Sequence, residues 1–348
     1  RERGKALGFN TASVYIGLAL GPSIGGLLVE HLGWRSIFFV NVPIGLLIIP
    51  LALFKIQDEI IDKRGERLDP VGMITYGLAL SMILLGLTLS EARGSPWAKT
   101  LVGAGFAVLA LFIYLESRVA SPLLDVRLFK NAPFAFSTLT ALLSYSSVFG
   151  VTFILSLYLQ LVARFGPEQA GLILLVQPVL MAAFSPLGGW LSDRVEPRIV
   201  ASAGMAIVAS SIFALSRLGA ASEWWQIAAI LMFLGTGHAF FSSPNINATM
   251  SSVGKKHYGV AAAILSTMRF TGQAVSLAVA TSVLSAQLGG AAVSAHAGAQ
   301  VPVEPFMKGM KLALEILAGI CALGVVTSLV RGTVRGAPGP GAEAAKND

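Results

Sequence analysis

Long apolar runs separated by short polar segments dominate the sequence. A helix that crosses a bilayer needs roughly 20 apolar residues, and ten runs approach or exceed that length. They cover residues 6–29, 36–54, 71–90, 99–117, 134–162, 168–191, 198–217, 225–247, 259–287 and 309–331. Because lipid offers the backbone no hydrogen-bond partner, each run is predicted to be a helix. The pattern therefore predicts an all-α, polytopic transmembrane helical bundle.

The charged segments between the runs predict the orientation of the chain. If the N-terminus is cytoplasmic, the inside segments carry 17 of the 25 Lys and Arg residues, Arg331 in the last of them included, and the outside segments carry 7. Arg269 lies inside a span. Since cytoplasmic loops carry the excess of basic residues, we expect an integral membrane protein with both ends cytoplasmic.

The composition supports a membrane protein and excludes several other classes. Hydrophobic residues make up 55% and charged residues 12% of the chain, where a soluble domain carries about 25% charged residues. The net charge of +7 is dispersed between apolar runs, so no nucleic acid is expected as a partner. The single cysteine, the four histidines without ligand spacing and the lack of a phosphate-binding or nucleophile motif predict no enzyme, metal or cofactor.

The first apolar run contains a regular pattern of glycines. The pattern G-x8-G-x3-G-P-x2-G-G comprises Gly8, Gly17, Gly21, Pro22, Gly25 and Gly26. Gly17, Gly21 and Gly25 recur every four residues, so one face of the predicted helix carries a stripe without side chains. Such a stripe allows a neighbouring helix to approach closely in lipid. Pro22 removes a backbone donor and bends the helix. An ordinary small-residue packing helix is the alternative interpretation of the stripe.

Two segments carry the strongest resemblance to a known family. The glycine pattern resembles the fifth-helix antiporter motif of major facilitator superfamily drug:proton antiporters, and Trp34–Gly45 resembles the start of the sixth helix in 14-span members. On these residues the chain is identified as a member of the 14-span drug:proton antiporter family of the EmrB/QacA type. The resemblance implies the major facilitator superfamily fold, a place in the bacterial inner (plasma) membrane, and multidrug efflux by alternating access. It also implies that the first four spans are absent, so that the N-terminal half is incomplete.

The same resemblance implies a division into four parts. Residues 1–54 correspond to the remainder of the N-terminal bundle with two spans, and residues 55–124 to a central pair of extra helices with cytoplasmic loops. Residues 125–331 correspond to the C-terminal six-helix bundle. Residues 332–348, rich in Gly, Pro and Ala, are predicted to be a disordered cytoplasmic tail.

A charged motif follows the sixth run at the predicted cytoplasmic face. It consists of Gly189, Asp193, Arg194 and Arg198. The Asp193 carboxylate is stabilised by the positive N-terminus of the following helix. Arg194 or Arg198 can form an ion pair with a neighbouring helix. The motif resembles the G-x-x-x-D-R gating loop of the superfamily, with Glu196 where the family has glycine. Two interpretations of the motif remain: a latch that holds one conformation, or a solvated loop whose charges only set the orientation in the membrane.

Two charged residues lie within the predicted spans. Arg269 is about ten residues from the inner end of its span, near mid-bilayer, where a charge costs at least ~2.5–3.5 kcal/mol. It is predicted to pair with a carboxylate or the substrate during the transport cycle, or else to form a structural ion pair. Glu315 lies less than two turns from the outer end of the last span. It can exchange a proton with an aqueous cavity or extend to the interface as a structural side chain.

Uncharged polar side chains inside the apolar runs are the candidates for a substrate cavity. They are Gln160, Gln177, Asn245 and Asn247, with His238 as a further polar group. Interhelical hydrogen bonding is the alternative role for each. Aromatic side chains that can line the same cavity are Tyr145, Phe149, Phe153, Tyr158, Phe240 and Phe241.

The function predicted on this basis is secondary active transport, as proton-coupled efflux of amphipathic or drug-like small molecules. The expected partners are the lipid bilayer, a small amphipathic substrate, protons and accessory export proteins. The alternative is a truncated membrane protein that uses the same fold as a scaffold or sensor without transporting anything. Fold alone does not decide between these functions.

Overall fold

The computed structural model describes residues 9–17, 28, 32–33, 35–55, 69–93, 96–119, 126–254, 257–288 and 302–332. Regular structure in these residues is helical. After a helical segment at 9–17, the elements are α2 (Ser36–Phe39), α3 (Asn41–Lys55), α4 (Pro70–Arg93), α5 (Pro96–Glu116), the 3-10 helix η1 (Val126–Lys130), α6 (Ala132–Leu157), the π-helix η2 (Tyr158–Val162), α7 (Pro167–Arg194), α8 (Pro197–Leu215), α9 (Trp224–Ser251), α10 (Tyr258–Leu288) and α11 (Val303–Val330). Every predicted span after the first coincides with helix.

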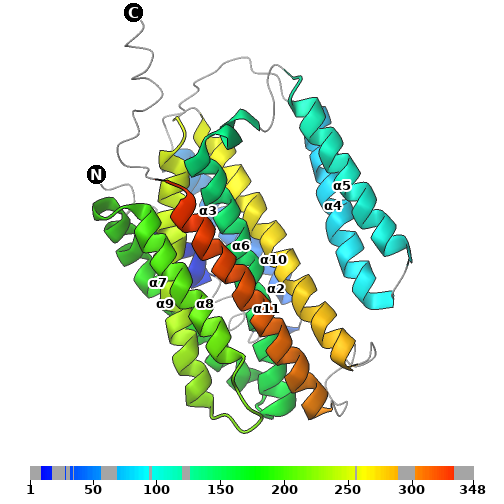
Figure 1. Ribbon diagram of the computed structural model, residues 1–348. Helices are drawn as coiled ribbons and strands as arrows, with labels where there is room; N and C mark the ends of the chain where they lie inside the picture. The colour runs from blue at the N-terminus through cyan, green and yellow to red at the C-terminus, as the bar shows by residue number, and fades with distance from the viewer. Residues whose placement is uncertain are drawn as a thin grey trace, which may run out of the picture.

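Several helices are long and apolar enough to cross a membrane. Among the described residues, six helical segments meet both conditions, and they belong to α5, α6 with η2, α7, α8, α9 and α11. The helix α10 lies among them and runs along the bundle (Figure 1). The prediction of an all-α transmembrane bundle is confirmed.

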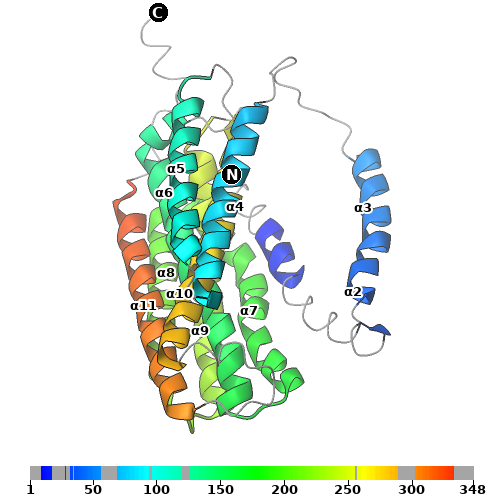
Figure 2. The ribbon, with the colours of Figure 1, turned by 90° about the vertical axis from the view of Figure 1, so that its right-hand side faces the viewer.

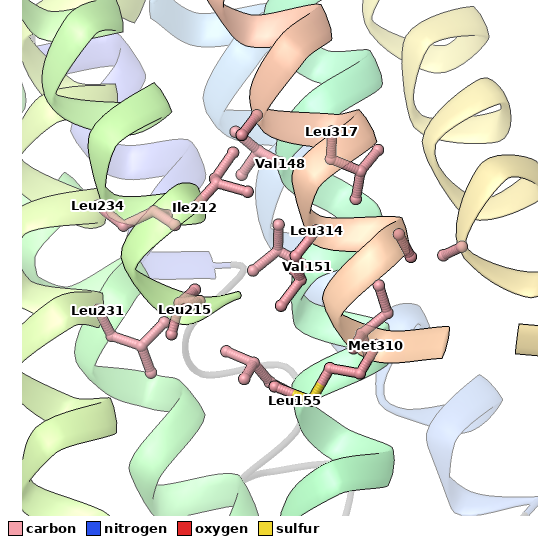
Figure 3. Close-up of a cluster of buried hydrophobic side chains, with 14 of the residues drawn as sticks. Val148, Val151, Leu155, Ile212, Leu215, Leu231, Leu234, Met310, Leu314 and Leu317 are labelled. Atoms are coloured by element: carbon pink, nitrogen blue, oxygen red, sulfur yellow. The ribbon is translucent and has the colours of Figure 1, made fainter. Parts of the chain in front are cut away.

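The centre of the bundle is an apolar cluster formed by α6, α8, α9 and α11. Val151 and Leu155 from α6 meet Ile212 from α8, Leu234 from α9 and Leu314 from α11, and all are fully buried (Figure 3). Because lipid tails are as apolar as these side chains, burial from lipid supplies little driving force. The cluster is therefore held mainly by dispersion contacts between closely fitted side chains.

Glycines bring α8 and α9 into backbone contact. A Cβ added at Gly204 would lie 2.6 Å from the carbonyl oxygen of Gly237, and one added at Gly237 would lie 2.8 Å from the carbonyl oxygen of Gly204. Real Cβ atoms do not approach backbone atoms so closely. The mutual placement of these two glycines therefore sets how near the two helices come, as small residues do at membrane helix interfaces.

The helices α4 and α5 form a hairpin beside the bundle. They pack on each other, and α4 also touches α10 (Figure 1). At the start of α4 the Asp69 carboxylate accepts a hydrogen bond of 2.9 Å from the Gly72 backbone N–H and so caps the helix. The hairpin lies within residues 55–124, where a central helix pair was expected. The helix α3 lies apart from the bundle (Figure 2).

Candidate functional site

The predicted gating motif spans the connection between α7 and α8. Gly189, Asp193 and Arg194 lie in the last turns of α7, and Arg198 lies in the first turn of α8. The Arg194 guanidinium stands 4.0 Å from the centre of the Trp190 ring on the same helix. This cation–π contact holds one of the two motif arginines against α7.

A buried arginine lies close to this connection. Arg331, directly after α11, is fully buried, although the charge pattern counted it among the cytoplasmic loop charges. Burial lowers its pKa to about 10; the Glu196 carboxylate opposes this shift and Arg198 adds to it. The guanidinium therefore remains charged at neutral pH. Sequence reasoning missed this residue because it directly follows an apolar run, as a loop charge does.

Arg331 binds one of the predicted cavity residues. Its guanidinium donates a hydrogen bond of 2.8 Å to the side-chain oxygen of Asn245 on α9. The Asn245 amide nitrogen donates at 3.1 Å to the backbone oxygen of Ser137 on α6. Arg331 also donates at 3.4 Å to the Ser137 hydroxyl. Three helix segments thus meet at one polar cluster, and Asn245 makes interhelical hydrogen bonds in this conformation.

The other predicted cavity residues do not gather at one place. The amide nitrogen of Asn247 donates at 3.0 Å to the hydroxyl of Ser192, which joins α9 to α7. Gln160 donates to the backbone oxygen of Ser156 one turn earlier, at 3.2 Å. Gln177 is buried on α7 and contacts Met181 of its own helix. The structure therefore does not join these amides into a single site.

The two embedded charges also lie apart, on different helices. Arg269 is half-buried on α10, and its guanidinium stands 4.9 Å from the centre of the Phe270 ring. Among the described residues, Arg269 makes no ion pair. Glu315 is half-buried on α11. Because α11 begins at Val303 and not near residue 309 as predicted, Glu315 lies roughly 18 Å along the helix from its start, deeper than expected.

One cluster joins the segment 9–17 to the C-terminal bundle. The Tyr15 hydroxyl donates a hydrogen bond of 3.1 Å to the Ser242 hydroxyl on α9. The His238 ring, one turn earlier on α9, meets the rings of Tyr15 and Tyr145 edge-on at centroid distances of 6.1 and 5.7 Å. The Arg269 charge also acts on Tyr15. We refer to Tyr15, Tyr145, His238, Ser242 and Arg269 as the central polar cluster.

Tyr15 is a further functional candidate that the sequence pattern did not single out. It belongs to the first apolar run, in which attention falls on the glycines. Of the glycine pattern, the structure describes Gly17, where nothing lies within 4 Å of the position of an added Cβ. The remaining members, Gly8, Gly21, Pro22, Gly25 and Gly26, lie outside the described residues. A polar side chain on a glycine-rich helix is the signal that would have pointed to Tyr15.

Comparisons with known proteins agree with this architecture. The model of the Major Facilitator Superfamily matches residues 1–277 and, in a second overlapping match, residues 137–345. The multidrug resistance protein Stp of Mycobacterium tuberculosis is 32% identical over 307 residues, which are 87% of this chain and 56% of that protein. The riboflavin transporter RibZ of Clostridioides difficile is 30% identical over 271 residues, 77% of this chain and 58% of that protein.

A third relative is named for an antibiotic. The tetracenomycin C resistance and export protein of Streptomyces glaucescens is 29% identical over 299 residues, which cover 85% of this chain and 56% of that protein. The chain thus spans a little over half the length of these curated relatives.

Proposed function

The chain belongs to the Major Facilitator Superfamily, and from that premise we propose that it acts in proton-coupled export of amphipathic, drug-like small molecules. The family match points to transport and not to catalysis. Transport in this superfamily proceeds by alternating access, in which helical bundles rock around a site near the bilayer midplane. Coupling to protons, the direction of transport and the class of substrate are the parts we propose here.

The observation that carries the proposal is the central polar cluster. Ionisable groups inside a membrane are expensive and mark substrate or ion pathways. Tyr15 and Ser242 connect the segment 9–17 to α9, the His238 ring borders this contact, and the charge of Arg269 acts on Tyr15. This polar contact joins the segment 9–17 to the C-terminal bundle. A transported ion or molecule that binds there can therefore change how the two are placed relative to each other.

Export of drug-like molecules is supported by the relatives. Two of those described above are named for multidrug resistance and for resistance to and export of tetracenomycin C. A further relative from Listeria innocua, 26% identical over 287 residues, is named a lincomycin resistance protein. Resistance by transport requires that the compound leaves the cell, which favours export.

A second candidate is uptake of a heteroaromatic nutrient. It is favoured by one observation, the similarity to a protein named as a riboflavin transporter. The two candidates differ in the direction of flux across the membrane. A vesicle experiment with defined sidedness therefore separates them.

The experiment that tests the proposal uses the protein expressed from its natural reading frame in bacterial cells. Cells are loaded with ethidium, a planar aromatic cation, and re-energised, and the loss of ethidium fluorescence is followed. We expect efflux to exceed that of cells with an empty vector and to stop when a protonophore collapses the proton gradient. In everted vesicles, acidifying the lumen should drive ethidium inward.

Each alternative predicts a different result. Efflux that persists after the gradient collapses would contradict proton coupling. Riboflavin accumulation by intact cells, with no efflux of ethidium, would favour the uptake candidate. Correct membrane insertion without movement of either compound would favour the non-transporting scaffold or sensor.

A further inference from the structure

We propose that His238 is the proton-binding group of this transporter and that adding a proton at its Nδ1 opens the contact between the segment 9–17 and α9. This inference rests on the proposed proton-coupled export and names the residue that carries the proton. It is built on the position of the ring, its surroundings and the contact that it borders.

The His238 ring is buried with an unused polar atom. The residue is 1% exposed and lies in the middle of α9. Within the part of the chain that the structure describes, Nδ1 has no hydrogen-bond partner. In the tautomer that carries its hydrogen on Nε2, this nitrogen presents a free lone pair. A proton can therefore be added there without breaking a hydrogen bond.

The surroundings of His238 are aromatic and shielded from solvent. The rings of Tyr15, Tyr145 and Phe241 stand edge-on to the imidazole, at centroid distances of 6.1, 5.7 and 5.9 Å. Removal of an ionisable group from water disfavours its charged form unless a partner compensates. The packed arrangement is therefore the one expected around a neutral imidazole.

The charged and titratable groups around the ring reinforce this preference. The segment 9–17 contributes Tyr15, α6 contributes Tyr145, and α10 contributes Arg269, whose positive charge acts on Tyr15. At this level of α9 the described contacts of α7 and α8 are made by uncharged groups, the Gln177 backbone beside Gly235 and Gly204 beside Gly237. Among the described residues no carboxylate pairs with the imidazole, so a proton added there would lack a compensating negative charge.

His238 therefore has a lower proton affinity in the packed arrangement than in one where the segment 9–17 has separated from α9. Protonation of His238 is unfavourable in the packed arrangement and becomes favourable once the segment 9–17 separates from α9 and water enters. A ligand shifts a conformational equilibrium by the difference in its affinity for the two states. The hydrogen bond of 3.1 Å between Tyr15 and Ser242 is part of the contact that must open. Proton binding at His238 thereby drives one half of the transport cycle.

The decisive experiment separates proton coupling from movement of the substrate. The natural protein is reconstituted in proteoliposomes, and two ethidium assays are compared: accumulation driven by a pH gradient and exchange of labelled for unlabelled ethidium at equal pH. We expect His238→Gln and His238→Asn to lower gradient-driven accumulation at least ~10-fold, which corresponds to ~1.4 kcal/mol, and to leave exchange within about twofold. His257→Gln, which alters a histidine outside the cluster, should leave both assays unchanged.

A variant that retains the histidine gives an independent measurement. Tyr15→Phe removes the bond to Ser242 and weakens the packed arrangement. Less work is then needed to open the contact, so protonation should occur at higher pH. We expect the midpoint of the pH profile of gradient-driven accumulation to rise by roughly 0.5–1 pH unit, the equivalent of one hydrogen bond. This measurement tests whether His238 binds the proton even if neither His238 variant folds.

The outcomes that overturn the inference are distinct from those that overturn the proposed function. Gradient-driven accumulation by both His238 variants within twofold of the wild type would overturn the inference alone. So would an unchanged pH profile in Tyr15→Phe, or loss of coupling in Glu315→Gln while His238→Gln stays coupled. Absence of gradient-driven ethidium movement in the wild type would overturn the proposed function, and this inference with it.

Discussion

The guanidinium of Arg331 donates a hydrogen bond of 2.8 Å to the side-chain oxygen of Asn245, and this contact joins the end of α11 to α9. Asn245 also connects α9 to α6, because its amide nitrogen donates a hydrogen bond to the backbone oxygen of Ser137. A charge without such a partner is poorly tolerated in an apolar interior. One amide thus both stabilises a buried cation and connects α9 with α6 and with the end of α11.

The first prediction concerns the two members of this pair, which should respond unequally to substitution. Asn245→Ala leaves the Arg331 charge buried without its closest acceptor, and we expect a loss of about 2–3 kcal/mol in the free energy of unfolding. Arg331→Gln removes the charge itself, and because two guanidinium nitrogens, Nε and Nη2, are buried without a described partner, its effect should be smaller. Thermal unfolding of both variants and of the double variant in detergent measures the order. A larger loss in Arg331→Gln would contradict the argument.

The second prediction concerns the contact between α8 and α9. A Cβ at Gly204 would lie 2.6 Å from both the carbonyl oxygen of Gly237 and the backbone nitrogen of Phe241. Since backbone atoms of two packed helices cannot move aside as a side chain can, Gly204→Ala should destabilise the bundle by about 1–3 kcal/mol. Gly103→Ala on α5 is the matched control, because nothing lies within 4 Å of that position. There we expect a neutral effect or a gain of roughly 0.5–1 kcal/mol from the higher helix propensity of alanine. Equal melting temperatures for the two variants would refute this account.

The helical architecture was largely predictable from the sequence, since a lipid environment leaves the backbone few alternatives. The limits of α4, α7 and α9 lie within a few residues of the predicted spans. α11 is the exception: it begins at Val303 because an amphipathic first turn extends the apolar run. The pairing of Lys308 with Glu304 at 2.9 Å supports this turn.

The site was less predictable, because its members come from segments far apart in the chain. The sequence pointed to Arg269, His238 and Asn245 as polar groups in apolar spans, and all three lie in or beside interhelical contacts. It could not indicate that Tyr15 meets Ser242, 227 residues away. It also could not show that Arg331 is buried, since burial beyond a helix end depends on how the neighbouring helices are placed.

The third prediction tests Arg269 as part of the central polar cluster. Arg269→Gln removes the charge that acts on Tyr15, whose contact with Ser242 must open in the transport cycle that we propose. We therefore expect gradient-driven ethidium transport to fall at least ~10-fold, with membrane insertion unchanged. Arg217→Gln is a matched control, because Arg217 also stands over an aromatic ring, Phe213 at 4.6 Å, but is exposed beyond the end of α8. Normal transport by Arg269→Gln, or an equal loss in the control, would reject a role for the charge of Arg269 in coupling.

The last prediction tests the gating motif through Asp193. This carboxylate lies in the final turn of α7, where a negative charge opposes the helix dipole, and only a short connection separates it from the positive N-terminus of α8. Neutralising it in Asp193→Asn should change the balance between the two conformations by about 0.3–1 kcal/mol, or up to roughly fivefold in a rate that depends on that balance. Initial rates of ethidium exchange in proteoliposomes measure the effect. Glu304→Gln provides the comparison, since Glu304 is an exposed carboxylate paired with Lys308 within the first two turns of α11. If the two substitutions alter exchange equally, the charge of Asp193 serves orientation in the membrane and not the conformational cycle.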